Sequence, residues 1–293
     1  MLICLGKLLR HFEYTSKSYL DTSDKLIYYI FFPVLLFWKI GGSSQAGGFD
    51  FHFIMATLLA LGLVVVLSLV IIVFGPVNSF QAGSFAQSCY RFNTYIGVAV
   101  VLNSLGETGI AYFGILIALA IPVIHVCAVS TLIWFSEKKP GSGRKSVVIL
   151  RSLVANPLII GCILGLIYAR TINTFPTFVD NALQMMSMVT LPLALLSIGG
   201  ALTFKGMFRN INLSLIAALC KLLILPLSGY LIYRLTGVEG IPFRVGMIFL
   251  CLPTSTALYV LSSQLNSDTE LASSTIVVST ILSFFSLSVA LVL

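Results

Sequence analysis

Long apolar stretches alternate with short polar ones along almost the whole chain. The apolar residues are concentrated in 24–40, 51–74, 84–105, 109–135, 146–169, 177–203, 211–233, 241–265 and 271–293. Most of these stretches are long enough to cross about 30 Å of hydrocarbon at about 1.5 Å per helical residue. A further stretch, 1–9, has about half the length that a spanning helix needs. The pattern predicts an all-α polytopic membrane protein with about ten transmembrane helices, the first of them truncated.

The composition supports a membrane protein and argues against several other classes. Hydrophobic residues make up 58% of the 293 residues and charged residues 9%, against roughly 25% charged residues in soluble domains. The net charge of +7 does not indicate nucleic-acid binding, because most of the basic residues lie between the apolar stretches. The sequence contains no nucleotide-binding loop, no metal-ligand motif and no pairing of a nucleophile with a base. We therefore expect neither an enzyme nor a cofactor.

Lysine and arginine residues are distributed unevenly between alternate sides of the predicted helices. Twelve of the 17, Arg91 among them, lie on one side, four lie on the other, and Lys221 is left inside a helix. Cytoplasmic loops of membrane proteins carry the excess of positive charge. We therefore expect the polar linker 136–145 on the cytoplasmic side of a cell membrane.

Landmark residues recur at a nearly constant offset along the chain. The pairs Gly6 and Gly165, Asp21 and Asp180, and Pro33 and Pro192 are 159 residues apart, and Thr94 and Thr254 are 160 apart. The offset divides the chain into 1–135 and 146–293, with five predicted helices in each half. An odd number of helices inverts the second half relative to the first, as is typical of secondary transporters. The sequence therefore predicts two inverted five-helix repeats.

The fourth and ninth apolar stretches, which the offset pairs, contain polar or helix-breaking residues near their centres. These are Asn93, Thr94 and Gly97 in the fourth stretch, and Pro253, Thr254, Ser255 and Thr256 in the ninth. Two helices that unwind there would present half-helix N-termini and hydroxyls, which favour an anionic group. The alternative is a simple proline kink, with the hydroxyls bonded to the preceding turn.

Lys221 lies near the middle of the predicted helix 211–233. Charges within membrane helices commonly serve transport, so one interpretation is a role in substrate binding or ion coupling. The other is a side chain that extends to the membrane surface. The predicted helices carry no Asp or Glu near their centres, so the sequence does not decide whether a proton or sodium is the coupling ion.

Four segments carry the pattern of a known family. They are NTYIGVAV from Asn93, ANPLIIGCILGLI from Ala155, LPLALLSIGGAL from Leu191 and LPTSTALYVLSSQLNSDTELASSTIVVSTILS from Leu252. These segments resemble the auxin efflux carrier family, which includes bacterial permeases for small carboxylates. The resemblance implies that broken helices four and nine cross. It also implies a scaffold of helices one, two, six and seven, and a transport domain of helices three to five and eight to ten that moves as an elevator.

The residues and the resemblance together lead to one hypothesis with two alternatives. We expect a secondary active transporter that moves a small organic anion, such as a dicarboxylate, across a prokaryotic cell membrane. Its expected partners are the substrate and the lipid bilayer, not nucleic acid, and a homodimer through the scaffold is left open. A membrane sensor or scaffold protein that no longer transports is one alternative. A carrier of a neutral or cationic solute is the other.

Overall fold

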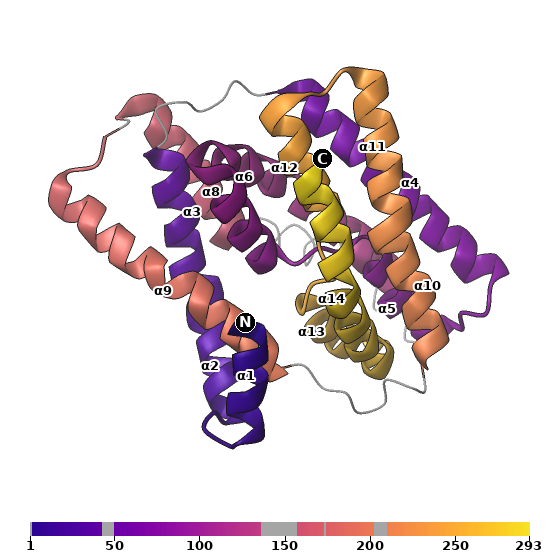
Figure 1. The fold of residues 1–293 in the computed structure, drawn as a ribbon. Helices are drawn as coiled ribbons and strands as arrows, with labels where there is room; N and C mark the ends of the chain where they lie inside the picture. The colour runs from indigo at the N-terminus through magenta and orange to yellow at the C-terminus, as the bar shows by residue number, and fades with distance from the viewer. Residues whose placement is uncertain (1, 43–49, 136–156, 173, 202–209) are drawn as a thin grey trace. The chain divides into compact units, whose positions relative to one another are not determined.

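The computed structural model describes residues 2–42, 50–135, 157–172, 174–201 and 210–293, and these residues are helical with short connections (Figure 1). The chain divides into two compact units. The first unit comprises Met1–Phe49, Val98–Leu119 and Ser152–Leu202. The second comprises Asp50–Gly97, Ala120–Arg151 and Thr203–Leu293. The linker 136–145 lies outside the described residues, so its position stays a prediction.

The first unit is built around two pairs of helices. Its elements are α1 (Leu2–His11), α2 (Lys17–Leu26), the π-helical turn η1 (Ile27–Phe31), α3 (Phe32–Gly41), α8 (Pro157–Thr171) and α9 (Thr177–Ala201). Helix α3 packs on α8, and α1 packs on α9. Glycine allows both close approaches, because a Cβ on Gly161 would lie 2.7 Å from the Pro33 carbonyl oxygen and one on Gly6 would meet the Leu196 backbone. Helix α1 has ten residues.

The second unit contains the helices on which the candidate site is built. They are α4 (Phe51–Phe74), α5 (Ser79–Tyr90), α10 (Ile211–Leu219), the π-helical turn η3 (Cys220–Ile224), α11 (Leu225–Thr236), α12 (Gly240–Leu250), α13 (Ala257–Gln264) and α14 (Thr269–Val292). Buried hydroxyl pairs join neighbouring helices: Thr57 and Tyr233 hydrogen-bond at 2.6 Å, and Ser214 donates to Ser274 at 2.8 Å. These bonds satisfy polar groups that would be costly in an apolar interior.

The long helix α6 (Thr94–Phe135) contributes residues to both units. It consists of two helices that meet at Gly106, where φ is 63° and ψ is −152°. This conformation is open to glycine and strained for other residues. The meeting point lies between the predicted helices 84–105 and 109–135. The first of these is itself interrupted, because α5 ends at Tyr90 and α6 begins at Thr94.

Hydropathy alone predicted several helices closely. The stretch 51–74 coincides with α4, and 177–203 corresponds to α9. The stretches 24–40 and 211–233 form continuous helices, each containing a π-helical turn that ends two residues before a proline, Pro33 or Pro226. A proline lacks the N–H of a regular turn, and such turns accommodate the resulting irregularity.

Five helices among the described residues are long and apolar enough to cross a membrane. They are Phe51–Phe74, the helical run Ser79–Leu132 with its breaks after Tyr90 and at Gly106, Thr177–Gly200, Ile211–Thr236 and Thr269–Val292. The shorter apolar helices Ile160–Thr171 and Gly240–Leu250 accompany them. The described part of the chain is therefore all-helical, with several helices suited to spanning a membrane, while the ten-helix inverted repeat remains a prediction.

Candidate functional site

The first interruption lies between α5 and α6, within the fourth apolar stretch. Arg91, which follows α5, has extended backbone angles of φ −69° and ψ 142°. The side chain of Asn93 then caps α6, because its Oδ1 accepts hydrogen bonds from the backbone N–H groups of Tyr95 at 3.1 Å and Ile96 at 3.2 Å. A cap of this kind satisfies donors that have no partner in the first turn of a helix.

The second interruption lies between α12 and α13, within the ninth apolar stretch. Helix α12 ends at Leu250 and α13 begins at Ala257, with Pro253 and the three hydroxyl residues between them. The Ser279 Oγ accepts from the Thr254 N–H at 3.2 Å, and the Ser286 Oγ donates to the Cys251 carbonyl at 2.9 Å. Helix α14 therefore pairs the backbone groups that this interruption leaves without helical partners.

The two interruptions are in direct contact within the second unit. The Asn93 N–H donates to the Pro253 carbonyl oxygen at 2.9 Å. The Thr254 hydroxyl donates to the Ser88 carbonyl, near the end of α5, at 3.0 Å. The aromatic rings of Phe92 and Phe249 lie 4.4 Å apart. The structure thus brings together the two groups of residues that the sequence offset of 160 pairs.

Lys221 lies beside the second interruption rather than at the surface of its unit. Its side chain is completely buried, and Nζ donates to the Leu250 carbonyl, at the end of α12, at 3.2 Å. A cation at a helix C-terminus is stabilised by the helix dipole and pairs a carbonyl that has no helical partner. The interpretation that Lys221 extends to the surface is therefore wrong for this structure.

Arg91 is a residue of the site that the charge count missed. It was counted with the cytoplasmic loops, but it lies in the first interruption, two residues before Asn93. Its side chain is half-buried, and Nη1 donates to Oε1 of the buried Gln87 at 2.6 Å. The Gln87 Nε2 in turn donates to the Gly83 carbonyl at 3.1 Å, which fixes the amide. The sequence could have indicated that Arg91 belongs to the site, because Arg91 lies inside the apolar stretch 84–105.

The polar groups of the site fall into two sets. Asn93, Pro253 and Thr254 are buried. The hydrogen bonds given above for these residues satisfy backbone groups at the helix ends. Gly97 is also buried. The half-exposed set consists of Arg91, Thr94, Ser255 and Thr256. The Ser255 hydroxyl oxygen accepts from the Ala257 N–H at 3.2 Å, which caps α13. The half-exposed set thus places one guanidinium and three hydroxyls at the starts of α6 and α13, where the helix dipoles are positive.

Comparison with known proteins identifies the chain's relatives. Residues 3–291 match the family model described as membrane transport protein. The chain is also similar to an uncharacterized transporter of Methanocaldococcus jannaschii, with 24% identity over 188 residues. That match covers 64% of this chain and 59% of the relative, so the chain spans less than two thirds of the relative's length. The match is to a family of transporters rather than of enzymes.

Proposed function

The chain belongs to the membrane transport protein family, and from this premise we propose that it is a secondary active transporter of a small organic anion, such as a dicarboxylate. Its membership confirms the resemblance to the auxin efflux carrier family. The main support for an anionic substrate is the position of Arg91, a half-buried cation in the first helix interruption. Guanidinium groups bind carboxylates through two parallel hydrogen bonds and do not lose their charge at physiological pH.

In the proposed binding mode, a carboxylate lies against the half-exposed set of site residues. Arg91 supplies the formal charge, and Thr94, Ser255 and Thr256 supply hydroxyl donors. The N-terminal ends of α6 and α13 each add the positive end of a helix dipole, equivalent to about half a charge. Asn93, Gly97, Pro253 and Thr254 form the buried junction that holds these groups in place.

The charges around the site favour an anion over the alternatives. Neither 91–97 nor 250–257 contains an Asp or Glu, so the described interruptions offer no carboxylate to a cationic solute. Lys221 adds a buried amine donor at the end of α12. A neutral solute would displace water from a guanidinium and two helix N-termini without supplying a negative charge. The alternative is a membrane sensor that binds the anion without transporting it. A flux measurement distinguishes this sensor from a transporter.

The division into two units supports an elevator movement of one part of the chain past another. Both interruptions and Lys221 belong to the second unit, which we propose carries the substrate. The described parts of the predicted scaffold helices, 1–9, 24–40, 146–169 and 177–203, belong to the first unit. Residues 98–119, which the resemblance assigns to the transport domain, belong to the first unit by contacts, and their part in the movement stays a proposal. We further propose a cell-membrane location with the linker 136–145 in the cytoplasm and a scaffold that can dimerise.

Reconstituted protein tests the proposal. Proteoliposomes containing wild-type protein should accumulate a labelled dicarboxylate such as malonate, with saturation and with dependence on a proton or sodium gradient. Malonate should also raise the unfolding temperature of the purified protein, because a ligand of the folded state stabilises it. Arg91→Gln should remove both effects, whereas Arg170→Gln, at the exposed end of α8, should leave them unchanged.

Two results would contradict parts of the proposal. Equal malonate binding by wild type and Arg91→Gln would remove the assigned role of Arg91. Binding without flux under any imposed gradient would favour the sensor.

A further inference from the structure

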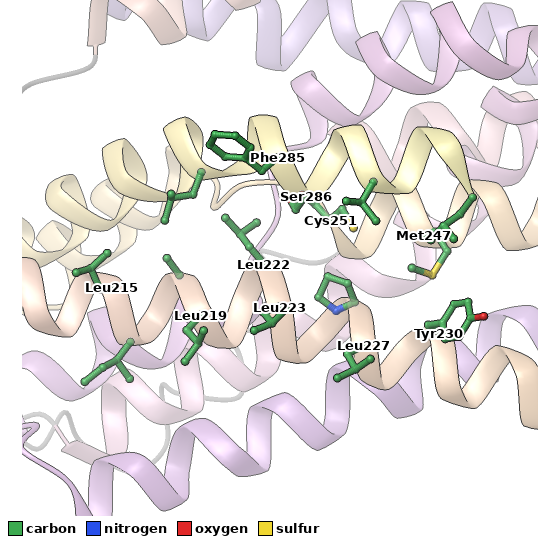
Figure 2. Close-up of a pocket in the computed structure, with 16 residues that line it drawn as sticks. Leu215, Leu219, Leu222, Leu223, Leu227, Tyr230, Met247, Cys251, Phe285 and Ser286 are labelled. Carbon is green, nitrogen blue, oxygen red and sulfur yellow. Dashed lines mark hydrogen bonds between the residues drawn. The ribbon is translucent and has the colours of Figure 1, made fainter.

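A long apolar groove runs along the second unit between the α10–α11 helix and α14 (Figure 2). We call it the α11–α14 groove. Its volume is about 710 Å³, within the range of roughly 300–1,000 Å³ typical of small-molecule sites. Its walls include Leu219, Leu223, Leu227, Phe285 and Val289. Among the sixteen lining residues, Tyr230 and Ser286 carry hydroxyls, and the Ser286 hydroxyl is bonded to the Cys251 carbonyl.

The groove lies on helices that are suited to hydrocarbon. Both walls belong to candidate membrane spans, Ile211–Thr236 and Thr269–Val292. Several lining side chains are exposed, among them Leu223 at 56% and Phe285 at 66%. From Leu215 to Tyr230 the helical rise of about 1.5 Å per residue gives a length of roughly 22 Å. This exceeds the roughly 15 Å of hydrocarbon in one leaflet, so the groove is long enough for an acyl chain.

A cation lies next to one end of the groove. Arg234 Nε donates to the hydroxyl of the lining residue Tyr230 at 3.2 Å, and the guanidinium carbon lies 5.2 Å from that ring and 5.7 Å from the ring of Phe243. This bond uses one of the five N–H donors of the guanidinium. Within the described part of the chain, Arg234 has no carboxylate within ion-pair distance. The aromatic rings therefore hold a cation whose remaining donors suit a phosphate.

We propose that the α11–α14 groove binds one acyl chain of a phospholipid whose phosphate is held by Arg234. The apolar lining excludes a polar solute, and the arginine at its end gives the occupant an anionic headgroup. The occupant also contacts the functional site, because Cys251, the first residue after α12, lines the groove. A bound chain would pack against this residue and stabilise the second interruption. The inference does not depend on the identity of the transported solute.

Native mass spectrometry of delipidated protein tests the site with three probes. These are dipalmitoyl phosphatidylglycerol, a diacylglycerol with the same chains, and glycerol phosphate alone. Leu223→Trp fills the groove, while Leu231→Trp is its matched control, because Leu231 is on the same helix, equally exposed at 54%, and outside the groove. Arg234→Gln removes the headgroup contact, with Arg170→Gln as its control. Thermal unfolding establishes that each variant is folded, and Leu227→Phe replaces Leu223→Trp if the latter is not.

The acyl chain and the headgroup of the lipid should respond to different variants. The groove-filling variant should lose the tightly held phosphatidylglycerol and diacylglycerol, and Leu231→Trp should keep both. Arg234→Gln should weaken phosphatidylglycerol binding about tenfold, as expected for a lost charged hydrogen bond, without affecting diacylglycerol. Glycerol phosphate alone should bind too weakly to detect. Equal lipid retention by Leu223→Trp and Leu231→Trp would overturn the groove, and unchanged phosphatidylglycerol affinity in Arg234→Gln would overturn the headgroup site.

Discussion

The backbone N–H of Asn93 donates to the carbonyl oxygen of Pro253 at 2.9 Å, so one main-chain hydrogen bond joins the two helix interruptions. The same asparagine caps α6 through its side chain. Around this bond, Thr254 pairs the Ser88 carbonyl at the end of α5 and Lys221 pairs the Leu250 carbonyl at the end of α12. Polar residues occur in these apolar stretches because four helix ends meet here and their backbone groups need partners.

Removing the cap at Asn93 should affect both stability and binding. Asn93→Ala removes two hydrogen bonds to the first turn of α6, and we expect the free energy of unfolding to fall by about 1 kcal/mol. The start of α6 should also become less ordered, so malonate affinity should fall. Thermal unfolding in detergent, with and without malonate, measures both effects.

Asn78 offers a matched control, because it caps α5 in the same unit through the Gln81 N–H at 2.9 Å. Asn78→Ala should cost similar stability and leave malonate affinity unchanged. Loss of affinity in both variants would show that capping acts only through global stability.

The polar and helix-breaking residues within apolar stretches predict where the two helices break, but not what the polar side chains do there. Arg91 lies within the predicted stretch 84–105, but the charge count places it with the loops rather than with the site. Thr254 was assigned to the substrate, yet its hydroxyl donates to Ser88, 166 residues earlier in the chain. Such a partner is set by tertiary packing, which local sequence does not contain.

The same limit applies to the helices themselves. A window of apolar residues predicts a helix such as α4, since length and hydropathy are local properties. It does not distinguish a straight helix from one with a π-helical turn, as in η1, or from two helices meeting at Gly106. Nor does it show that residues 98–119 pack with the first unit. The linker and the repeat symmetry stay predictions from sequence.

The two threonines of the second interruption should respond differently to loss of a hydroxyl. Thr254→Val removes the bond to Ser88 and leaves a buried carbonyl without that partner, so stability should fall by about 1–3 kcal/mol. Thr256→Val changes a half-exposed residue and should leave stability within about 0.5 kcal/mol while weakening malonate binding. Parallel unfolding and binding titrations separate the two. The reverse pattern, with Thr256→Val destabilising and Thr254→Val affecting only affinity, would contradict the division into buried and accessible groups.

Replacing Lys221 should separate its charge from its packing. Lys221→Met keeps an unbranched side chain and removes an amine that is costly to bury, which offsets the lost partner of the Leu250 carbonyl. We expect the variant to fold with an unfolding temperature close to that of wild type. Malonate affinity should fall about tenfold, or about 1.4 kcal/mol, since a positive charge near the second interruption is lost.

The control for this charge is Lys39→Met in the first unit, where Lys39 pairs with Glu107 at 2.7 Å. It should leave malonate affinity unchanged. A Lys221→Met variant that binds malonate as wild type does, but unfolds at lower temperature, would limit Lys221 to capping α12.

Two glycine substitutions compare a tightly packed position in the first unit with a position that has free space around it. A Cβ on Gly161 of α8 would lie 2.7 Å from the Pro33 carbonyl oxygen and 2.9 Å from its Cα, and backbone atoms cannot move aside as a flexible side chain can. Gly161→Ala should therefore lower the free energy of unfolding by about 1–3 kcal/mol. A Cβ on Gly62 of α4 would meet no neighbouring atom within 4 Å, so Gly62→Ala should stabilise by up to about 1 kcal/mol through helix propensity. Chemical unfolding of both variants measures the difference. Equal stability of the two would mean that α3 and α8 do not approach as closely as this packing requires.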